Sequence, residues 1–167
     1  MADIWEIAGR SALMGLAATA ILDLWILVQK QLFGVPIPDW GLVGRWVGHF
    51  PQGRLVHESI AKAAPIPGER VLGWTVHYAV GLTFATIAVL LWGLDWARRP
   101  TFLPALVVGM ASVVAPYFVM QPGMGLGIAA SKAPKPWPAR RRSFITHTVF
   151  GVALYLAAII VAALWRA

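Results

Sequence analysis

The stretch Gly73–Trp96, GWTVHYAVGLTFATIAVLLWGLDW, decides the fold class of this chain. It is long and apolar enough to cross a bilayer, because a membrane-spanning helix needs about 20 mainly apolar residues. Three further stretches are comparably long and apolar, so we predict four transmembrane helices. The predicted spans cover residues 11–28, 71–94, 102–120 and 144–164. None of these runs alternates apolar and polar residues, which excludes the strands of a membrane barrel.

The composition supports the same class. Hydrophobic residues make up 59% of the 167 residues and charged residues 13%, whereas soluble domains are about half apolar and a quarter charged. We therefore predict an all-α integral membrane protein, a four-helix transmembrane bundle forming one domain over residues 1–167. The absence of cysteine excludes disulfides, thiolate metal sites and cysteine nucleophiles.

The basic residues are distributed unevenly about the predicted spans. Ten of the 14 Lys and Arg residues lie in the two long loops, which join the first span to the second and the third to the fourth. The terminal side has only Arg10, Arg98, Arg99 and Arg166. Because cytoplasmic loops are enriched in Lys and Arg, we predict that the long loops face the cytoplasm. The basic residues flank apolar spans, so the net charge of +7 predicts contact with membrane lipids and no nucleic-acid partner.

The first long loop is predicted to contain an interfacial amphipathic helix. In RLVHESIAKAA, residues 54–64, the apolar side chains fall on one helical stripe, and Glu58 and Lys62 have the spacing of a helical ion pair. The preceding run GLVGRWVGHF, residues 41–50, offers an apolar surface from which Arg45 and His49 emerge. We expect this run to lie in the membrane interface or to dip inward.

The second long loop combines glycines with a cluster of basic residues. Gly123, Gly125 and Gly127 are predicted to permit close helix packing or a sharp re-entry of the chain. The basic residues that follow are predicted to contact anionic lipid, and the alternative is that they only determine the topology. These predicted lipid or anion contacts are Lys132, Lys135, Arg140, Arg141 and Arg142.

Three ionisable side chains, Asp23, His77 and His147, lie inside predicted spans near the long loops. An ionised Asp near a helix centre costs about 2.5–3.5 kcal/mol on insertion scales, so Asp23 needs a partner or a proton. Since the three come from different helices, we predict that they converge on one polar site, with Gln121 as a further candidate. The structural alternatives are an Asp23 pair with a loop arginine and imidazoles that donate to a carbonyl or hydroxyl.

Imidazole and carboxylate groups also raise the alternative of a bound metal, because both are suitable ligands for zinc or iron. The candidate ligands are His49, His57, His77, His147, Glu58 and Glu69. Haem held by His77 and His147 is a further alternative. Position 61, four residues after His57, is Ala61, so the zinc-metalloprotease helix is absent. The sequence therefore assigns neither a metal nor a cofactor.

Five stretches carry a resemblance that covers nearly the whole chain. They are ATAILDLW at 18–25, GRWVGHF at 44–50, HESIAKAAPIPGERVLGWTVHYAVG at 57–81, QPGMGLGIAASKAP at 121–134 and THTVFGVALY at 146–155. Together they resemble the small bacterial membrane proteins known as domain of unknown function 2938. The resemblance implies a four-span protein of the bacterial inner membrane, whose termini are then periplasmic. It implies no activity.

Three classes of function fit these features. The first is a polar His/Asp site at the cytoplasmic leaflet that binds a small lipid-soluble molecule, a metal or a cofactor, with or without catalysis. The second is a small proton-coupled transporter, a use to which intramembrane carboxylates lend themselves. The third is an accessory or assembly subunit of a larger membrane complex. No nucleophile triad, phosphate loop or metal motif indicates an enzyme, and we favour the first class without assigning a reaction.

Overall fold

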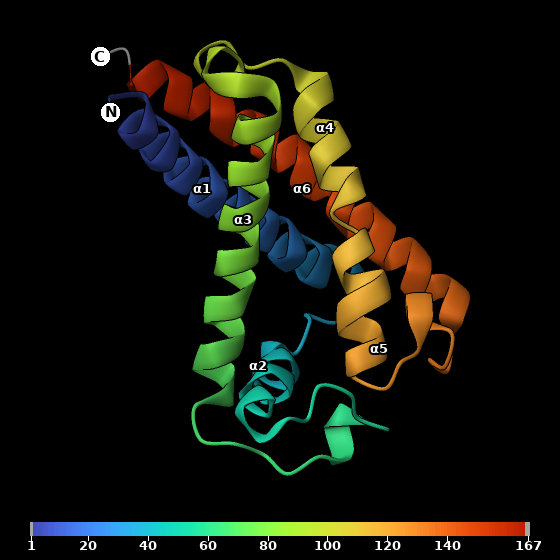
Figure 1. Ribbon diagram of the computed structural model, residues 1–167. Helices are drawn as coiled ribbons and strands as arrows, with labels where there is room; N and C mark the ends of the chain where they lie inside the picture. Colours follow the sequence, from blue (N-terminus) through green and yellow to red (C-terminus); the bar gives the residue numbers. More distant parts are fainter. Residues whose placement is uncertain (1, 166–167) are drawn as a thin grey trace. The chain divides into compact units, whose positions relative to one another are not determined.

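Four helices in the computed structural model are long and apolar enough to cross a membrane, which confirms the predicted all-α fold (Figure 1). The model describes residues 2–165, and these contain no strand. The four helical segments are Asp3–Phe33, Glu69–Arg98, Phe102–Gly123 and Pro136–Leu164. Each contains a predicted span and extends beyond it at one or both ends. Arg166, one of the basic residues counted on the terminal side, lies outside the described residues.

The connections between the helices differ in length, and the longest joins α2 to α3. In chain order they are α1 (Ala2–Phe33), α2 (Trp40–Gly48), α3 (Glu69–Arg98), α4 (Phe102–Ala111), α5 (Gln121–Gly123) and α6 (Pro136–Leu164). A π-helical turn at Pro116–Met120 precedes α5. Pro116 has no N–H to donate, so the third membrane-length helix departs from regular α-helical hydrogen bonding there. In α3 the helical dihedrals are interrupted at Gly93, whose φ of 79° is readily adopted without a Cβ.

The first long loop contains an α-helix, but the prediction that this helix covers residues 54–64 is wrong. The helix is α2, which Asp39 caps by accepting a hydrogen bond from the Gly41 N–H at 2.9 Å. Between residues 54 and 64 only Ile60–Lys62 forms a short 3-10 turn. The N–H groups of His57 and Ile60 donate instead to the carbonyls of Gly123 and Met124. Tertiary partners thus replace the hydrogen bonds that a helix would have made.

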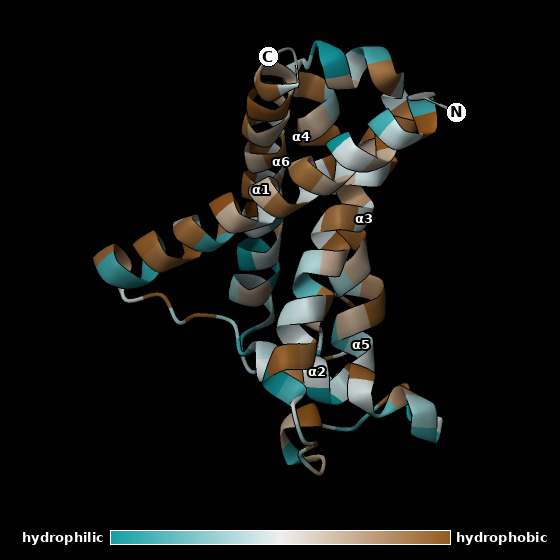
Figure 2. Ribbon diagram, turned by 90° about the vertical axis from the view of Figure 1, so that its left-hand side faces the viewer, coloured by the Kyte–Doolittle hydropathy of each residue, from teal (hydrophilic) through white to brown (hydrophobic). Residues whose placement is uncertain are grey.

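The chain divides into two compact units. The first unit comprises Met1–Ile37, Tyr78–Ser112 and Thr146–Ala167, and the second comprises Pro38–His77 and Val113–Ile145. The core of the first unit is apolar and rich in alanine, with Met14, Val89 and Leu154 as its largest fully buried apolar side chains. Figure 2 shows hydrophobic residues along most of α1. The prediction of a single domain stays a prediction.

Glycines let backbones approach closely within the first unit. A Cβ added to Gly109 in α4 would collide with the backbone of Gly151 in α6. A Cβ at Gly15 in α1 would lie 2.6 Å from the Cα of Leu82 in α3. Small residues at such crossings allow the dense packing that stabilises helices in a membrane.

The second unit has its own small core, formed by Val43, Trp46, Ile60 and Met124. The Trp46 indole donates from Nε1 to the Leu55 carbonyl at 2.8 Å. A Cβ at Gly123 would lie 2.6 Å from that same Nε1, so only glycine fits beside the indole. This contact agrees with the close packing predicted for the glycines of the second long loop.

Candidate functional site

Asp23 lies in the first unit and is partly buried in α1. The Tyr78 hydroxyl donates to its Oδ2 at 3.1 Å. Tyr78 directly follows His77 in α3. This hydrogen bond gives the Asp23 side chain a polar partner, which a polar group in an apolar span requires.

His147 also belongs to the first unit, where it pairs with Ser112 at the end of α4. The Ser112 Oγ lies 2.6 Å from the His147 Nδ1 and 2.6 Å from the Gly109 carbonyl oxygen. A carbonyl oxygen can only accept, so the single hydroxyl proton of Ser112 goes to Gly109. The Ser112 oxygen then accepts from Nδ1–H of His147. In the neutral ring this tautomer leaves Nε2 unprotonated, as a base or a metal ligand requires.

His77 belongs to the second unit and is held by two tryptophans. Its imidazole stacks on the Trp40 indole, with centroids 3.9 Å apart and planes inclined by 22°. The Trp74 indole lies 5.7 Å away in an edge-to-face arrangement. A Cβ at Gly73 would collide with the Trp40 carbonyl, so this glycine allows α2 to approach α3. The two indoles therefore set the plane of the His77 ring.

His49 and His57 form a pair in the second unit. The His49 Nδ1 lies 3.0 Å from the His57 Nε2, and the rings stack with centroids 5.0 Å apart. One of these two nitrogens must donate and the other accept, so one proton lies between the rings. His49 is only 3% exposed, and the His57 Nδ1 is buried without a hydrogen-bond partner among the described residues.

The two glutamate candidates have different surroundings. Glu69 forms an ion pair with Arg45, and the Ile66 N–H also donates to Glu69 at 3.1 Å. Glu58 is exposed, and its backbone carbonyl lies where a Cβ on Gly125 would collide with it. No three His, Asp or Glu side chains in residues 2–165 are grouped so that they could hold a metal ion. Among the predicted ligands the structure thus brings His49 and His57 together as a pair.

Gln121 is 5% exposed in the second unit. Its Nε2 donates to the Ser143 hydroxyl at 3.2 Å, and its Oε1 is buried without a partner among the described residues. Burying an acceptor without a hydrogen bond costs about 1–3 kcal/mol. The role of Gln121 in a polar site stays a prediction.

The predicted basic lipid contacts divide into two kinds. Arg140 donates from Nε to the Ala129 carbonyl at 2.7 Å, and its own carbonyl accepts from the Tyr117 hydroxyl at 2.6 Å. It thereby supports Ala129, whose φ of 47° is unusual for a residue with a side chain. The other four are exposed, and their contact with lipid stays a prediction: Lys132, Lys135, Arg141 and Arg142.

A family model described as Protein of unknown function (DUF2938) matches residues 12–161, which cover most of the chain. The chain belongs to this family. The predicted resemblance is therefore confirmed, and it brings no activity with it. No curated protein and no solved structure matches the DUF2938 protein at a significant level.

Several partners of the site residues in this DUF2938 protein were missed by sequence reasoning. Ser112 and Tyr78 stand in apolar runs, and no motif connects them with His147 or Asp23. No sequence motif connects Trp40 with His77 either. The spacing of Glu6 and Arg10, four residues apart, was a usable signal, because such pairs meet on one helix face. They form an ion pair at 2.8 Å.

Proposed function

We propose that the protein binds a small lipid-soluble molecule, a metal or a cofactor through its intramembrane histidine and aspartate side chains. The observation that carries the proposal is the Ser112–His147 contact of 2.6 Å, because it assigns the proton of the neutral imidazole to Nδ1. The Nε2 atom is then available to accept a proton from a bound hydroxyl or amine, or to ligate a metal.

Asp23 supports a site that extends beyond His147. The carboxylate of Asp23 accepts from Tyr78, the chain neighbour of His77. We propose that Asp23 and His147, which both belong to the first unit, contribute to one site, in which the carboxylate compensates positive charge on the imidazole or on the ligand. Intramembrane carboxylates with such partners commonly serve a function, which favours this proposal over isolated structural roles.

The proposed location is the bacterial inner membrane. The excess of Lys and Arg in the two long loops supports a cytoplasmic position for these loops, with both termini in the periplasm. Asp23 lies in the second half of α1, and His147 lies in the first half of α6, the helix that follows the second long loop. The proposed site would then lie in the cytoplasmic leaflet.

The test uses full-length protein purified in detergent from bacterial membranes. Absorbance spectra, metal analysis and mass spectrometry of solvent extracts are compared for the wild type, His147→Gln and Ser112→Ala. We expect a bound species in the wild type that is lost in His147→Gln and reduced in Ser112→Ala. Thr86→Ala is the matched control, because the Thr86 hydroxyl donates to the Leu82 carbonyl within an exposed part of α3.

Two outcomes contradict the proposal. One is a wild type that carries no metal, chromophore or small molecule above the level of the detergent blank. The other is a bound species that His147→Gln retains in full. Either outcome favours the alternatives, an accessory subunit or a small proton-coupled transporter, because neither requires a ligand that survives purification.

A further inference from the structure

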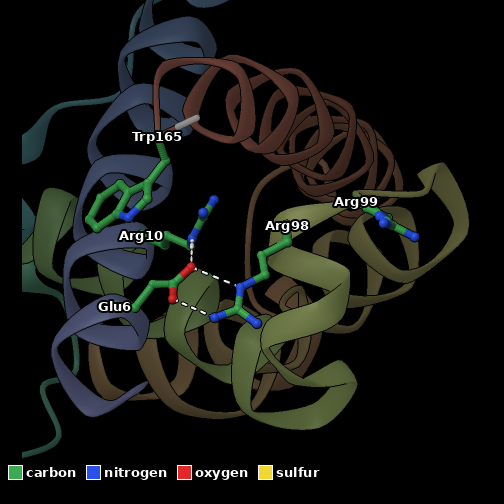
Figure 3. Close-up of a pocket in the computed structure, with 5 residues that line it drawn as sticks. All are labelled: Glu6, Arg10, Arg98, Arg99 and Trp165. Atoms are coloured by element: carbon green, nitrogen blue, oxygen red, sulfur yellow. Dashed lines mark hydrogen bonds and ion pairs between the residues drawn. The ribbon is translucent and has the colours of Figure 1, made fainter. Parts of the chain in front are cut away.

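A cavity of about 400 Å³ lies in the first unit, and its lining includes no residue of the proposed histidine site (Figure 3). Sites for small molecules commonly have volumes of about 300–1,000 Å³. The lining residues come from the first turns of α1, the end of α3 and the residue after α6. They are Glu6, Arg10, Arg98, Arg99 and Trp165.

Arg10 is the most enclosed cation of this cavity, with 3% of its surface exposed. Its Nε donates to Glu6 at 2.8 Å and its Nη1 to the Ala97 carbonyl at 3.2 Å. Its guanidinium carbon also lies 5.0 Å from the centre of the Trp165 ring. These contacts offset the cost of burying the charge. They use two of the five N–H groups of a guanidinium, which leaves donors for a ligand.

Glu6 orients a second cation beside the first. Arg98 donates to both Glu6 oxygens, from Nε at 3.0 Å and from Nη2 at 2.6 Å. Figure 3 shows the Glu6 carboxylate between Arg10 and Arg98. Two exposed carboxylates, Asp3 and Asp95, lie 4.0 and 3.9 Å from Arg98 at the edge of this cluster. One glutamate thus fixes two guanidinium groups and neutralises only one of them.

Arg99 supplies a third positive charge. Its side chain is exposed and makes no hydrogen bond or ion pair with any of residues 2–165. The lining therefore holds three guanidinium groups against the single carboxylate of Glu6. Counted together with Asp3 and Asp95, which lie beside Arg98, the described carboxylates equal these three guanidinium groups in number.

We propose that this cavity binds a phosphate group, carried either by an anionic phospholipid or by a water-soluble phosphate compound. Guanidinium groups present their N–H donors in a planar fork that matches phosphate oxygens. A phosphate group offers several oxygens that accept hydrogen bonds, and Arg10 and Arg99 keep N–H groups that no described contact uses.

Trp165 shapes the apolar wall of the cavity and depends on a glycine. A Cβ at Gly9 would lie 2.5 Å from Cη2 of Trp165, so the indole can lie against α1 only because position 9 lacks a side chain. The cavity therefore combines cations with an aromatic ring at the helix ends, the depth at which lipid headgroups meet a membrane protein.

The test measures phosphate binding by the full-length protein in detergent at low ionic strength, because salt screens exposed charges. Calorimetry with inorganic phosphate probes the water-soluble source. Native mass spectrometry with phosphatidylglycerol probes the lipid source, and diacylglycerol is the lipid control without phosphate. The decisive variant is Arg99→Gln, because this side chain makes no described contact that folding needs. Arg141→Gln, at an exposed arginine of the second unit, is the matched control.

We expect the wild type to bind at least one of the two phosphate probes and to bind diacylglycerol much more weakly. Loss of one charge-assisted contact should weaken binding about tenfold or more in Arg99→Gln and leave Arg141→Gln unchanged. Arg10→Lys should also weaken binding, because lysine keeps the positive charge and loses the planar fork of N–H donors.

Binding of phosphatidylglycerol alone identifies a lipid headgroup, and binding of inorganic phosphate identifies a water-soluble source. Failure of both probes with the wild type, equal binding of diacylglycerol, or equal effects of Arg99→Gln and Arg141→Gln would overturn the proposal.

Discussion

The guanidinium of Arg45 in α2 binds both carboxylate oxygens of Glu69 in the first turn of α3, through Nε at 2.8 Å and Nη2 at 2.7 Å. Its Nη1 also faces three carbonyls of the intervening loop, at 3.4, 3.4 and 3.3 Å from Ile60, Ala61 and Ala63. The hydrogen bond with Glu69 raises the pKa of Arg45 above its usual value, so the guanidinium stays charged at every physiological pH. One side chain therefore connects α2, the loop and α3 within the second unit.

Replacing this arginine by lysine should destabilise the second unit. We expect Arg45→Lys to lower the melting temperature of the protein in detergent, because an ammonium group cannot bind Glu69 through two parallel hydrogen bonds and also reach the loop carbonyls. Arg70→Lys is the control, at an exposed arginine next to Glu69 in the sequence. Equal melting temperatures for the two variants, measured by thermal denaturation, would refute the importance of this connection.

The crossing of α4 and α6 should tolerate no side chain at Gly109. We expect Gly109→Ala to cost about 1–3 kcal/mol of unfolding free energy, because the new Cβ would collide with the Gly151 backbone and force the helices apart. Val107→Ala serves as the control on the same helix, at a side chain that is 45% exposed. Unfolding in mixed micelles measures both, and a Gly109→Ala variant as stable as the control would speak against the close crossing.

Asp23 and His77 should be energetically coupled if they share a site. We expect the effects of Asp23→Asn and His77→Ala on stability to be non-additive in the double variant, by at least about 0.5 kcal/mol. The reason is that residues of one hydrogen-bonded network usually couple energetically. Tyr78→Phe removes the hydroxyl that binds Asp23 at 3.1 Å and controls for the loss of that contact alone. Strict additivity in thermal unfolding would favour separate structural roles.

The orientation of the chain can be tested with single cysteines, since the natural sequence contains none. We expect cysteines at Lys62 and Lys135 to resist a membrane-impermeant thiol reagent in intact cells, because the long loops are predicted to be cytoplasmic. A cysteine at Asp95, whose side chain is fully exposed, should react. All three should react after the cells are permeabilised. Labelling in the reverse pattern would invert the topology.

The four spans could be predicted from the sequence because span length depends on a local property, the hydropathy summed along about 20 residues. Glu69–Arg98 illustrates the limit, since the prediction found residues 71–94 and missed the helical ends. The helix of the first long loop was misplaced for a different reason. Residues 40–48 and 54–64 both carry apolar stripes, and the distant carbonyls of Gly123 and Met124 decide which segment stays extended.

The ionisable residues of the candidate site could be predicted from the sequence. The side chains that form hydrogen bonds with them could not. Asp23 and His147 stand out because charges and imidazoles are rare inside apolar spans. Ser112 lies 35 residues from His147, and Tyr78 lies 55 residues from Asp23, so no spacing in the sequence connects them. The tautomer of His147 follows only from the position of the Gly109 carbonyl.

The sequence by itself determined the all-helical membrane fold, because bilayer thickness and backbone hydrogen bonding leave few alternatives for long apolar runs. From the sequence, Arg10, Arg98 and Arg99 could be identified only as basic residues on the side of the predicted spans where the termini lie. Tertiary structure alone decided that Arg98 meets Glu6 across 92 residues and that Arg10 lies over Trp165. The physical reason is that such contacts depend on which faces of distant helices pack together, and local hydropathy does not encode that pairing.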